Sequence, residues 1–226
     1  MKRTIFCIAA IFSLIMVVPV SAQPRGRGYA PPAPRYGGSS RVTRYHMPNT
    51  YFGLRFGVSA SHVNSDATYL DGGKSQSGMN VGAVAGIQMS PMMPLFFETG
   101  LLYTEKGGKG DNGNKFTFDL NYLEVPLTLK YSARVAPATA VEPFIGGYLA
   151  CGVGGKIKDF GNRSAYSSFG DGGFKRFDGG IRVGCGLAWE MLYAELGYDF
   201  GLTNIGDDYF NDTHNGAFFA NIGINF

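Results

Sequence analysis

The sequence is poor in several residue types, and each scarcity excludes a class of protein. It has 3 cysteines, 1 tryptophan and 3 histidines in 226 residues, and the cysteine spacing matches no metal-binding motif. Charged residues make up only 16%, and the net charge of +3 is too small to indicate a nucleic-acid-binding protein. We therefore expect no metal site, no cofactor and no nucleic-acid partner.

Long hydrophobic runs are also missing, except at the N-terminus. Lys2 and Arg3 precede an apolar run, Pro19 ends that run, and residues 20–22 are small. The run is shorter than the ~18–20 residues that a membrane-spanning helix needs. The pattern predicts a signal peptide over residues 1–22. Any later membrane-embedded part must be a closed β-barrel, because unpaired backbone groups are too costly in lipid.

The segment from residue 23 to residue 48 has no acidic residue and is dominated by proline and glycine. It carries five arginines: Arg25, Arg27, Arg35, Arg41 and Arg44. A segment without apolar periodicity cannot bury enough surface to fold. We predict a disordered basic periplasmic segment, and the alternative is an arm that binds anionic lipid headgroups or a protein partner. The folded domain then covers residues 49–226.

Glycine and aromatic residues are abundant, with 34 glycines and 14% aromatics. From Tyr51 onward, apolar residues alternate with polar or small ones in eight segments, which is the period of a β-strand. No charged residue occurs on the apolar side of any segment. Nine charges fall on the other side: Arg55, Glu98, Glu124, Lys130, Lys156, Arg182, Glu190, Glu195 and Asp199.

This partition of side chains distinguishes a membrane barrel from a soluble β-sandwich. A charge on the lipid face near mid-membrane costs about 2–4 kcal/mol, so a membrane barrel turns its charges inward. Glycine on the polar side suits a narrow lumen, and charges of both signs can pair there. The last residue, Phe226, is an aromatic on the apolar side and resembles the assembly signal of outer-membrane barrels. We predict an all-β fold: a closed antiparallel up-and-down transmembrane barrel of about eight strands.

The connections between the segments alternate in length. Four are long: Ser61–Ser77, Lys106–Phe116, Gly161–Phe177 and Thr203–Asn215. Two are short, Ser90–Pro94 and Glu190–Met191, and one is intermediate, Ser132–Val141. The alternation predicts long extracellular loops and short periplasmic turns, with both chain termini in the periplasm. Pro126 lies inside the fourth segment and cannot donate to a ladder, so we predict a β-bulge there.

Pro126 also belongs to a recognisable motif. The run Tyr122-Leu123-Glu124-Val125-Pro126-Leu127, closing with Lys130-Tyr131, resembles the central motif of the PorT-like outer-membrane β-barrel family, small OmpX/OmpW-like barrels of Bacteroides-type bacteria. Residues 142–147 and 198–205 are similar to that family's next and penultimate strands. The resemblance covers about Tyr51 to Phe226. It implies a barrel in the outer membrane of a Gram-negative bacterium and no shared biochemical activity.

The expected strand number bears directly on function. With about eight strands the lumen is too narrow for an aqueous channel, so we expect its charges to pair and plug it. The resulting role is structural, adhesive or partner-binding. The expected partners are outer-membrane lipid, the barrel-assembly machinery and an extracellular or periplasmic protein. The alternative function is a narrow gated pore for ions or small solutes.

A lipid-modifying enzyme is a third hypothesis. His62 and His214 adjoin the first and last segments, which barrel closure brings together, and four candidate partners lie nearby in sequence: Ser61, Ser65, Asp66 and Asp212. No lipase-type G-x-S-x-G motif accompanies them, so we predict no catalytic residue.

An aspartate group and a cysteine pair do not define a binding site. Asp207, Asp208 and Asp212 do not match the spacing of a calcium loop, which favours a solvated loop. Cys151 and Cys185 lie on neighbouring segments and fit either a disulfide or two small lipid-facing side chains.

Overall fold

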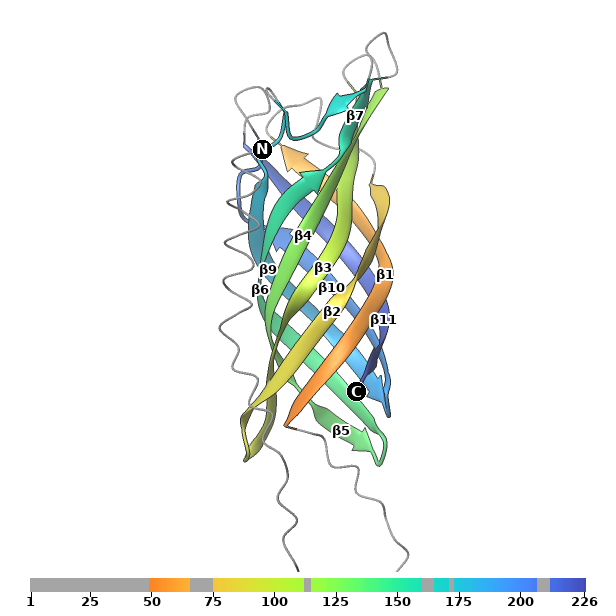
Figure 1. Ribbon diagram of the computed structural model, residues 1–226, viewed down its shortest axis with the longest axis vertical. Coiled ribbons are helices and arrows are strands. Elements are labelled where there is room, and N and C mark those ends of the chain that lie inside the picture. Colours follow the sequence, from red (N-terminus) through yellow and green to blue (C-terminus); the bar gives the residue numbers. More distant parts are fainter. Residues whose placement is uncertain (1–48, 66–74, 112–114, 160–164, 171–172, 207–211) are drawn as a thin grey trace, which may run out of the picture.

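The computed structural model describes residues 49–65, 75–111, 115–159, 165–170, 173–206 and 212–226. The predicted signal peptide (1–22) and basic segment (23–48) lie outside these residues. No helix in the described part of the chain is long and apolar enough to cross a membrane. The described residues form strands and their connections (Figure 1).

Eight long strands make up the molecule: β1 (Thr50–Ser65), β2 (Gln76–Ser90), β3 (Met93–Asp111), β4 (Lys115–Tyr131), β6 (Thr139–Gly154), β9 (Phe177–Trp189), β10 (Leu192–Gly201) and β11 (Thr213–Asn225). Three short strands accompany them: β5 (Ala133–Ala136), β7 (Lys156–Asp159) and β8 (Tyr166–Ser167). β5 forms a small hairpin with β6, while β7 and β8 extend the sheet beyond the end of β6.

The eight long strands close into a barrel. Each is antiparallel to its neighbours in the order β6-β9-β10-β11-β1-β2-β3-β4, and the pairing of β4 with β6 completes the ring. The first and last strands meet, and Phe52 and Phe226 exchange two backbone hydrogen bonds of 2.9 and 2.8 Å. The predicted all-β, closed, up-and-down barrel is therefore confirmed, and the strand count is eight.

The two faces of the wall differ as the alternation predicted. On β1, Phe52, Leu54, Phe56 and Val58 are each about half exposed on the outside, while Arg55 between them is buried inside. The same outward exposure holds for apolar side chains on β2, β9, β10 and β11: Met79, Val81, Ile181, Leu187, Leu192, Leu196, Phe200, Phe218, Ile222 and Ile224. Apolar outside and polar inside is the arrangement of a barrel solvated by lipid.

The two ends of the barrel differ in their connections. β1 begins and β11 ends at the end where β2–β3, β5–β6 and β9–β10 are joined by two residues each, at the bottom of Figure 1; we call it the short-turn end. The opposite end is the long-loop end. There the predicted loop Lys106–Phe116 is wrong, because β3 and β4 stay paired as far as Asp111 and Lys115. Outward residues such as Glu105 are polar in this stretch, so the hydrophobic alternation disappears while the hydrogen bonding continues.

The predicted bulge at Pro126 is also wrong. Pro126 is buried and opposes Tyr148, and β3 keeps one register with β4 on both sides of it, from Thr99↔Leu127 to Leu102↔Glu124. The β3–β4 ladder has no residue paired with Pro126. The N–H group that proline lacks is therefore not needed there, and the strand accommodates Pro126 without a bulge.

The irregularity between β4 and β6 lies closer to the long-loop end. The register shifts between Asn121 and Tyr122, where one step on β4 spans Gly152 to Gly154 on β6. Gly155 then adopts a φ of 144°, a conformation that favours glycine, and ends β6. Together these features shift the side-chain phase of the following strand β7 by one residue.

Cys151 and Cys185 are not close enough for a disulfide. Cys185 opposes Pro143 in the β6–β9 ladder, while Cys151 opposes Phe177 at the other end of the same pair of strands. Eight residues of strand separate the two positions by roughly 26 Å. A disulfide needs Cα atoms within about 7 Å, so no intramolecular bond joins these two cysteines.

Candidate functional site

Most of the predicted inward charges lie in the lumen. Seven of the nine are buried there: Arg55, Glu98, Glu124, Lys130, Arg182, Glu195 and Asp199. Lys156 does not belong to the set, because the phase shift after Gly155 turns it outward and exposes it. Glu190 does not belong either, because β9 ends at Trp189 and Glu190 is exposed in the turn, at a positive φ of 54°.

Lys106 is a fourth lumen cation, which the predicted segments did not include. Its side chain is buried and comes from the part of β3 that was expected to be a loop. The signal was present: extending the period of two from Glu98 along β3 places Lys106 on the same face. Two further buried acids were missed. Glu142 accepts a 2.8 Å hydrogen bond from Ser132, and Asp178 accepts one of 2.9 Å from Asn215.

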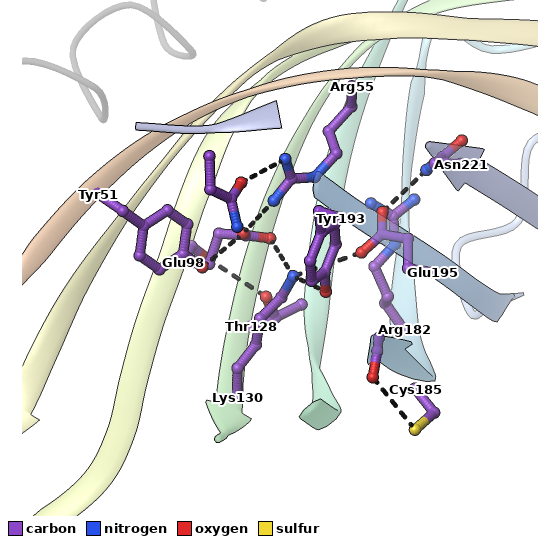
Figure 2. A network of polar contacts seen from close by, with 12 residues as sticks. Tyr51, Arg55, Glu98, Thr128, Lys130, Arg182, Cys185, Tyr193, Glu195 and Asn221 are labelled. Atoms are coloured by element: carbon purple, nitrogen blue, oxygen red, sulfur yellow. Dashed lines mark hydrogen bonds and ion pairs between the residues drawn. The ribbon is translucent and has the colours of Figure 1, made fainter. Parts of the chain in front are cut away.

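Toward the short-turn end, Glu98 and Lys130 form the centre of a charge network (Figure 2). Glu98 receives Arg55 at 3.2 Å and Lys130 at 2.8 Å, and Lys130 also reaches Glu195 across the lumen at 3.3 Å. Lys130 donates a 2.6 Å hydrogen bond to the hydroxyl of Tyr193, and the Arg55 guanidinium lies 4.1 Å from the centre of the Tyr193 ring. Four strands are thereby joined through side chains alone.

The next level of the lumen contains a closed ring of two cations and two acids. Arg182 binds both oxygens of Asp199 at 2.7 Å and also forms an ion pair with Glu124. Lys106 binds the same two acids, Glu124 at 2.9 Å and Asp199 at 3.5 Å. The Lys106 ammonium also lies 4.1 Å from the centre of the Tyr148 ring, a cation–π contact.

We call these eight side chains the charge layer: Arg55, Glu98, Lys106, Glu124, Lys130, Arg182, Glu195 and Asp199. It has four cations and four acids, so the paired charges balance. Burying a charge without a partner costs several kcal/mol, and a balanced network avoids that cost without adding much net stability. The charge layer therefore fixes the positions of the strands relative to one another and adds little to the free energy of unfolding of the barrel.

A small cavity lies inside the charge layer. A cavity of about 10 Å³ lies between Glu98, Lys130, Arg182 and Glu195, with Pro126 in its wall. A single water needs about 10–15 Å³ measured in this way. The cavity therefore holds one water at most.

Beyond the charge layer, toward the long-loop end, buried apolar side chains gather in the lumen beside polar ones such as Asp178 and Asn215. Ten buried side chains form an apolar layer: Val63, Phe118, Leu120, Tyr122, Tyr148, Ala150, Ile157, Phe169, Phe174 and Ile205. Phe118, Leu120 and Tyr122 come from β4, on the same inward face that carries Glu124 nearer the short-turn end. The inward face of one strand thus changes from charged to apolar along its length.

Two members of the apolar layer, Phe169 and Phe174, come from the segment between β7 and β9. Residues 165–170 and 173–176, the mouth segment, fold into the opening of the barrel. The Phe169 ring meets Tyr122 edge-on at 5.6 Å and lies over Gly152, where an added Cβ would be 2.4 Å from the ring. Arg176 donates a 2.9 Å hydrogen bond to the Gly152 carbonyl, and Ser168 donates one of 2.7 Å to the Asp119 carbonyl. Glycine at position 152 is what makes room for the mouth segment.

The rim residues considered for catalysis lie on opposite faces of the wall. His62 and His214 project from the outer face of β1 and β11, and His62 Nε2 lies 3.3 Å from the Tyr198 hydroxyl. Ser61 and Ser65 are buried on the inner face, where Ser65 contacts Thr213 at 2.8 Å. Barrel closure brings the two strands together but does not pair a histidine with either serine.

Among the described residues, no three His, Cys, Asp or Glu side chains gather closely enough to hold a metal ion. Asp207 and Asp208 lie outside the described residues. Asp212 forms a hydrogen bond with Asn204, whose side-chain oxygen accepts hydrogen bonds from the Gly206 and Thr213 amides.

Comparison with known families identifies the kind of barrel. The family described as an outer membrane protein beta-barrel domain matches residues 46–207, most of the chain. The chain belongs to this family. It is therefore a small outer-membrane β-barrel, and the predicted localisation in the outer membrane is confirmed.

Solved barrels of similar fold share little sequence with this member of the family. Neisserial surface protein A is 17% identical over 77% of this chain and 97% of its own, with a TM-score of 0.49. OprG of Pseudomonas aeruginosa is 13% identical over 80% and 97%, with a TM-score of 0.45. Ail of Yersinia pestis is 14% identical over 79% and 100%, with a TM-score of 0.38. None of the curated protein sequences compared with the chain matches it.

Proposed function

We propose that this barrel neither conducts nor catalyses, and that its role in the outer membrane is structural, adhesive or partner-binding. The observation that carries the proposal is the filling of the lumen. The charge layer and the apolar layer follow one another along the axis, and the cavity inside the charge layer holds one water at most. An ion crossing this lumen would have to separate paired charges and then lose its hydration shell while it passes between aromatic side chains. Each of these steps is unfavourable.

Conductance across a planar bilayer tests this proposal. We expect the folded, purified barrel to give the baseline of the bare bilayer at all applied voltages. The competing function is a narrow gated pore. The charge layer, which lines the lumen toward the short-turn end, favours this function. Discrete current steps that change amplitude in Glu124→Gln, but not in the turn variant Glu190→Gln, would establish the pore and refute the plug.

We further propose that the long-loop end faces the cell exterior and that both termini lie in the periplasm. The support is the asymmetry of the connections, because outer-membrane barrels have short periplasmic turns and longer external loops. Labelling of intact cells with a membrane-impermeant maleimide tests the orientation. Ser167→Cys at the long-loop end should react in intact cells, while Ala136→Cys at the short-turn end should react only after lysis. The reverse pattern would refute this orientation.

We also propose specific partners for the barrel and its membership of the PorT-like family. The hydrogen-bonded, outward-facing Phe226 supports contact with the barrel-assembly machinery during insertion, and the apolar belt supports contact with lipid. The motif around Pro126 supports a PorT-like barrel. An extracellular or periplasmic protein partner would be sought by crosslinking and pull-down of the full mature chain. The absence of catalysis predicts that His62→Ala and His214→Ala leave membrane lipids unchanged.

A further inference from the structure

The short-turn end of the barrel carries large apolar side chains at its very edge. Met92 and Met191 belong to the β2–β3 and β9–β10 turns, and Val135 lies one residue before the end of β5. Phe226 ends the chain where β11 meets β1. Met92 is 94% exposed, and each of the other three is exposed over half of its surface or more. We call these four side chains the apolar rim.

The apolar rim surrounds the whole barrel. Around the ring of strands, the β9–β10 turn is followed by the junction of β11 with β1, then by the β2–β3 turn, and then by β5, which pairs with β6 (Figure 1). A folded protein partner would cover one side of such an end. Apolar side chains on every side of the circumference fit a medium that surrounds the barrel, and around the wall that medium is lipid.

The rim continues the apolar outer side of the strands, which we call the apolar belt. On β3 the outward residues from the first residue of the strand onward are Met93, Leu95, Phe97, Thr99, Leu101 and Tyr103. The stretch from Met93 to Tyr103 spans about 33 Å of strand, or about 25 Å along the barrel axis at a tilt of about 40°. The apolar band of outer-membrane barrels is also about 25 Å tall. The belt on β3 therefore begins at Met93, and Met92 lies at its edge.

The two ends of the barrel are therefore placed differently. At the long-loop end, β3 continues beyond Tyr103 as far as Asp111 and stays paired with β4, and its next outward residue is the acid Glu105. At the short-turn end, Met93 is both the first residue of β3 and the first residue of its apolar outer side. Strand length that would project beyond the hydrocarbon is thus present at one end of β3 and missing at the other.

The charges beside the apolar rim are compatible with the edge of a membrane. Arg134 precedes Val135 and Glu190 precedes Met191, and both charged residues are exposed. A charge at the interface costs far less than a charge at mid-membrane, and an arginine can lay its apolar stem along lipid while its guanidinium stays in water. Exposed methionine, valine and phenylalanine side chains, in contrast, gain by leaving water.

We propose that the apolar rim is immersed in the leaflet at the short-turn end, with Met92, Val135 and Met191 at the boundary between headgroups and acyl chains. The barrel then ends level with the membrane on this side. In the described part of the chain, strands extend into water only at the long-loop end, so a folded partner finds a rigid barrel surface only there. The inference rests on the proposed contact of the barrel with lipid, and it deepens the proposed partner-binding role by assigning the partner to one end.

Quenching of tryptophan fluorescence by brominated lipid measures the depth of the rim. The native tryptophan is removed in Trp189→Phe, and single tryptophans are then introduced as Met92→Trp and Met191→Trp. The folded full mature chain is placed in vesicles of phosphatidylcholine that is brominated near the carbonyl end of its acyl chains. We expect each variant to lose about half of its fluorescence or more, because these bromines lie within about 10 Å of the headgroup boundary. Iodide in the water should quench both variants less than Ser167→Trp, a control at the exposed long-loop end.

A further variant separates the depth of the rim from the lipid contact of the belt. Leu196→Trp, in the same Trp189→Phe chain, reports on the belt, because Leu196 is 57% exposed on the outer face of β10. If brominated lipid quenches Leu196→Trp but only one or neither of the turn variants, the immersed rim is overturned. A turn variant that is shielded from both quenchers is covered by protein, which overturns it equally. If Leu196→Trp itself escapes the lipid quencher, the proposed lipid contact fails instead.

Two controls complete the experiment. All substituted side chains are exposed on the outside of the barrel, and heat-modifiable migration on a gel shows whether each variant is folded. Maleimide labelling that reverses the proposed orientation would assign the rim to the other leaflet and leave its depth unchanged.

Discussion

Removing the charge of Glu124 is the most direct probe of the charge layer. Glu124 is fully buried and binds two cations, Arg182 and, at 2.9 Å, Lys106. The change Glu124→Gln keeps the size of the side chain and one accepting oxygen but leaves both cations dependent on Asp199 alone. The charge layer then carries one uncompensated positive charge beside a cavity of about 10 Å³.

The size of the effect follows from burial. Breaking a buried ion pair by neutralising one partner costs about 3–5 kcal/mol, because the other charge remains desolvated and unpaired. Since the glutamine oxygen still accepts a hydrogen bond, we expect a loss of about 3 kcal/mol for Glu124→Gln, at the lower end of that range. Glu190→Gln is the matched control, since Glu190 is exposed in a turn, and it should shift stability by less than about 0.5 kcal/mol.

A second variant separates lost charge balance from lost packing. In Glu124→Gln/Lys106→Met the surviving pair, Arg182 and Asp199, is neutral again. We expect this double variant to recover at least about 1.5 kcal/mol relative to the sum of the two single losses, which is the coupling expected for side chains in one network.

Reversible unfolding by urea in lipid vesicles measures these values. Trp189, the only tryptophan, is 56% exposed on the outer face and reports transfer from lipid to water through its fluorescence. If Glu124→Gln unfolds at the same urea concentration as Glu190→Gln, the charges of the lumen are screened by water. The account of a filled lumen would then be wrong, together with the expectation of no conductance.

Three further predictions concern single features of the wall. Glu190→Gly should raise the free energy of unfolding by about 1 kcal/mol, because glycine adopts the positive φ of this turn without strain; equal or lower stability would contradict it. Without reductant, Cys151 and Cys185 of the unfolded chain should both react with an alkylating reagent, and protection of the pair would reveal a disulfide. Phe226→Ser should lower the heat-modifiable fraction recovered from outer membranes, and an unchanged fraction would remove Phe226 as an assembly signal.

The barrel itself was predictable from the sequence because lipid imposes a strict rule on each strand. Strands β1, β10 and β11 have apolar residues at every second position over the whole length in contact with lipid, and their phase and pairing agree with the structure. A charge on the lipid face is so unfavourable that Arg55, Glu195 and Asp199 could face only the lumen. Energetic penalties of several kcal/mol leave a clear pattern in a single sequence.

The remaining features depend on effects that leave a weaker pattern. Lys106 was assigned to a loop because β3 loses its apolar outer side beyond Tyr103, although its hydrogen bonds to β4 continue. Lys156 was placed inside because nothing in its own strand shows the register shift opposite Asn121 and the positive φ of Gly155. A bulge moves all following side chains to the other face, so one unrecognised residue reverses each later assignment on that strand.

The inversion along β4 explains why the lumen has two layers. Between Leu123 and Tyr131 the outer side is apolar and the inner side carries Glu124 and Lys130, as lipid contact requires. Between Phe116 and Tyr122 the order reverses: Thr117 and Asp119 face outward, while the buried side is apolar. A wall surrounded by lipid leaves only its interior for polar groups, whereas a wall surrounded by water must bury its apolar groups inside. The change of sign near residue 122 therefore marks where β4 leaves the hydrocarbon. Beyond it, the inner face of β4 joins the apolar layer that the mouth segment completes, beside buried polar side chains of other strands such as Asp178 and Asn215.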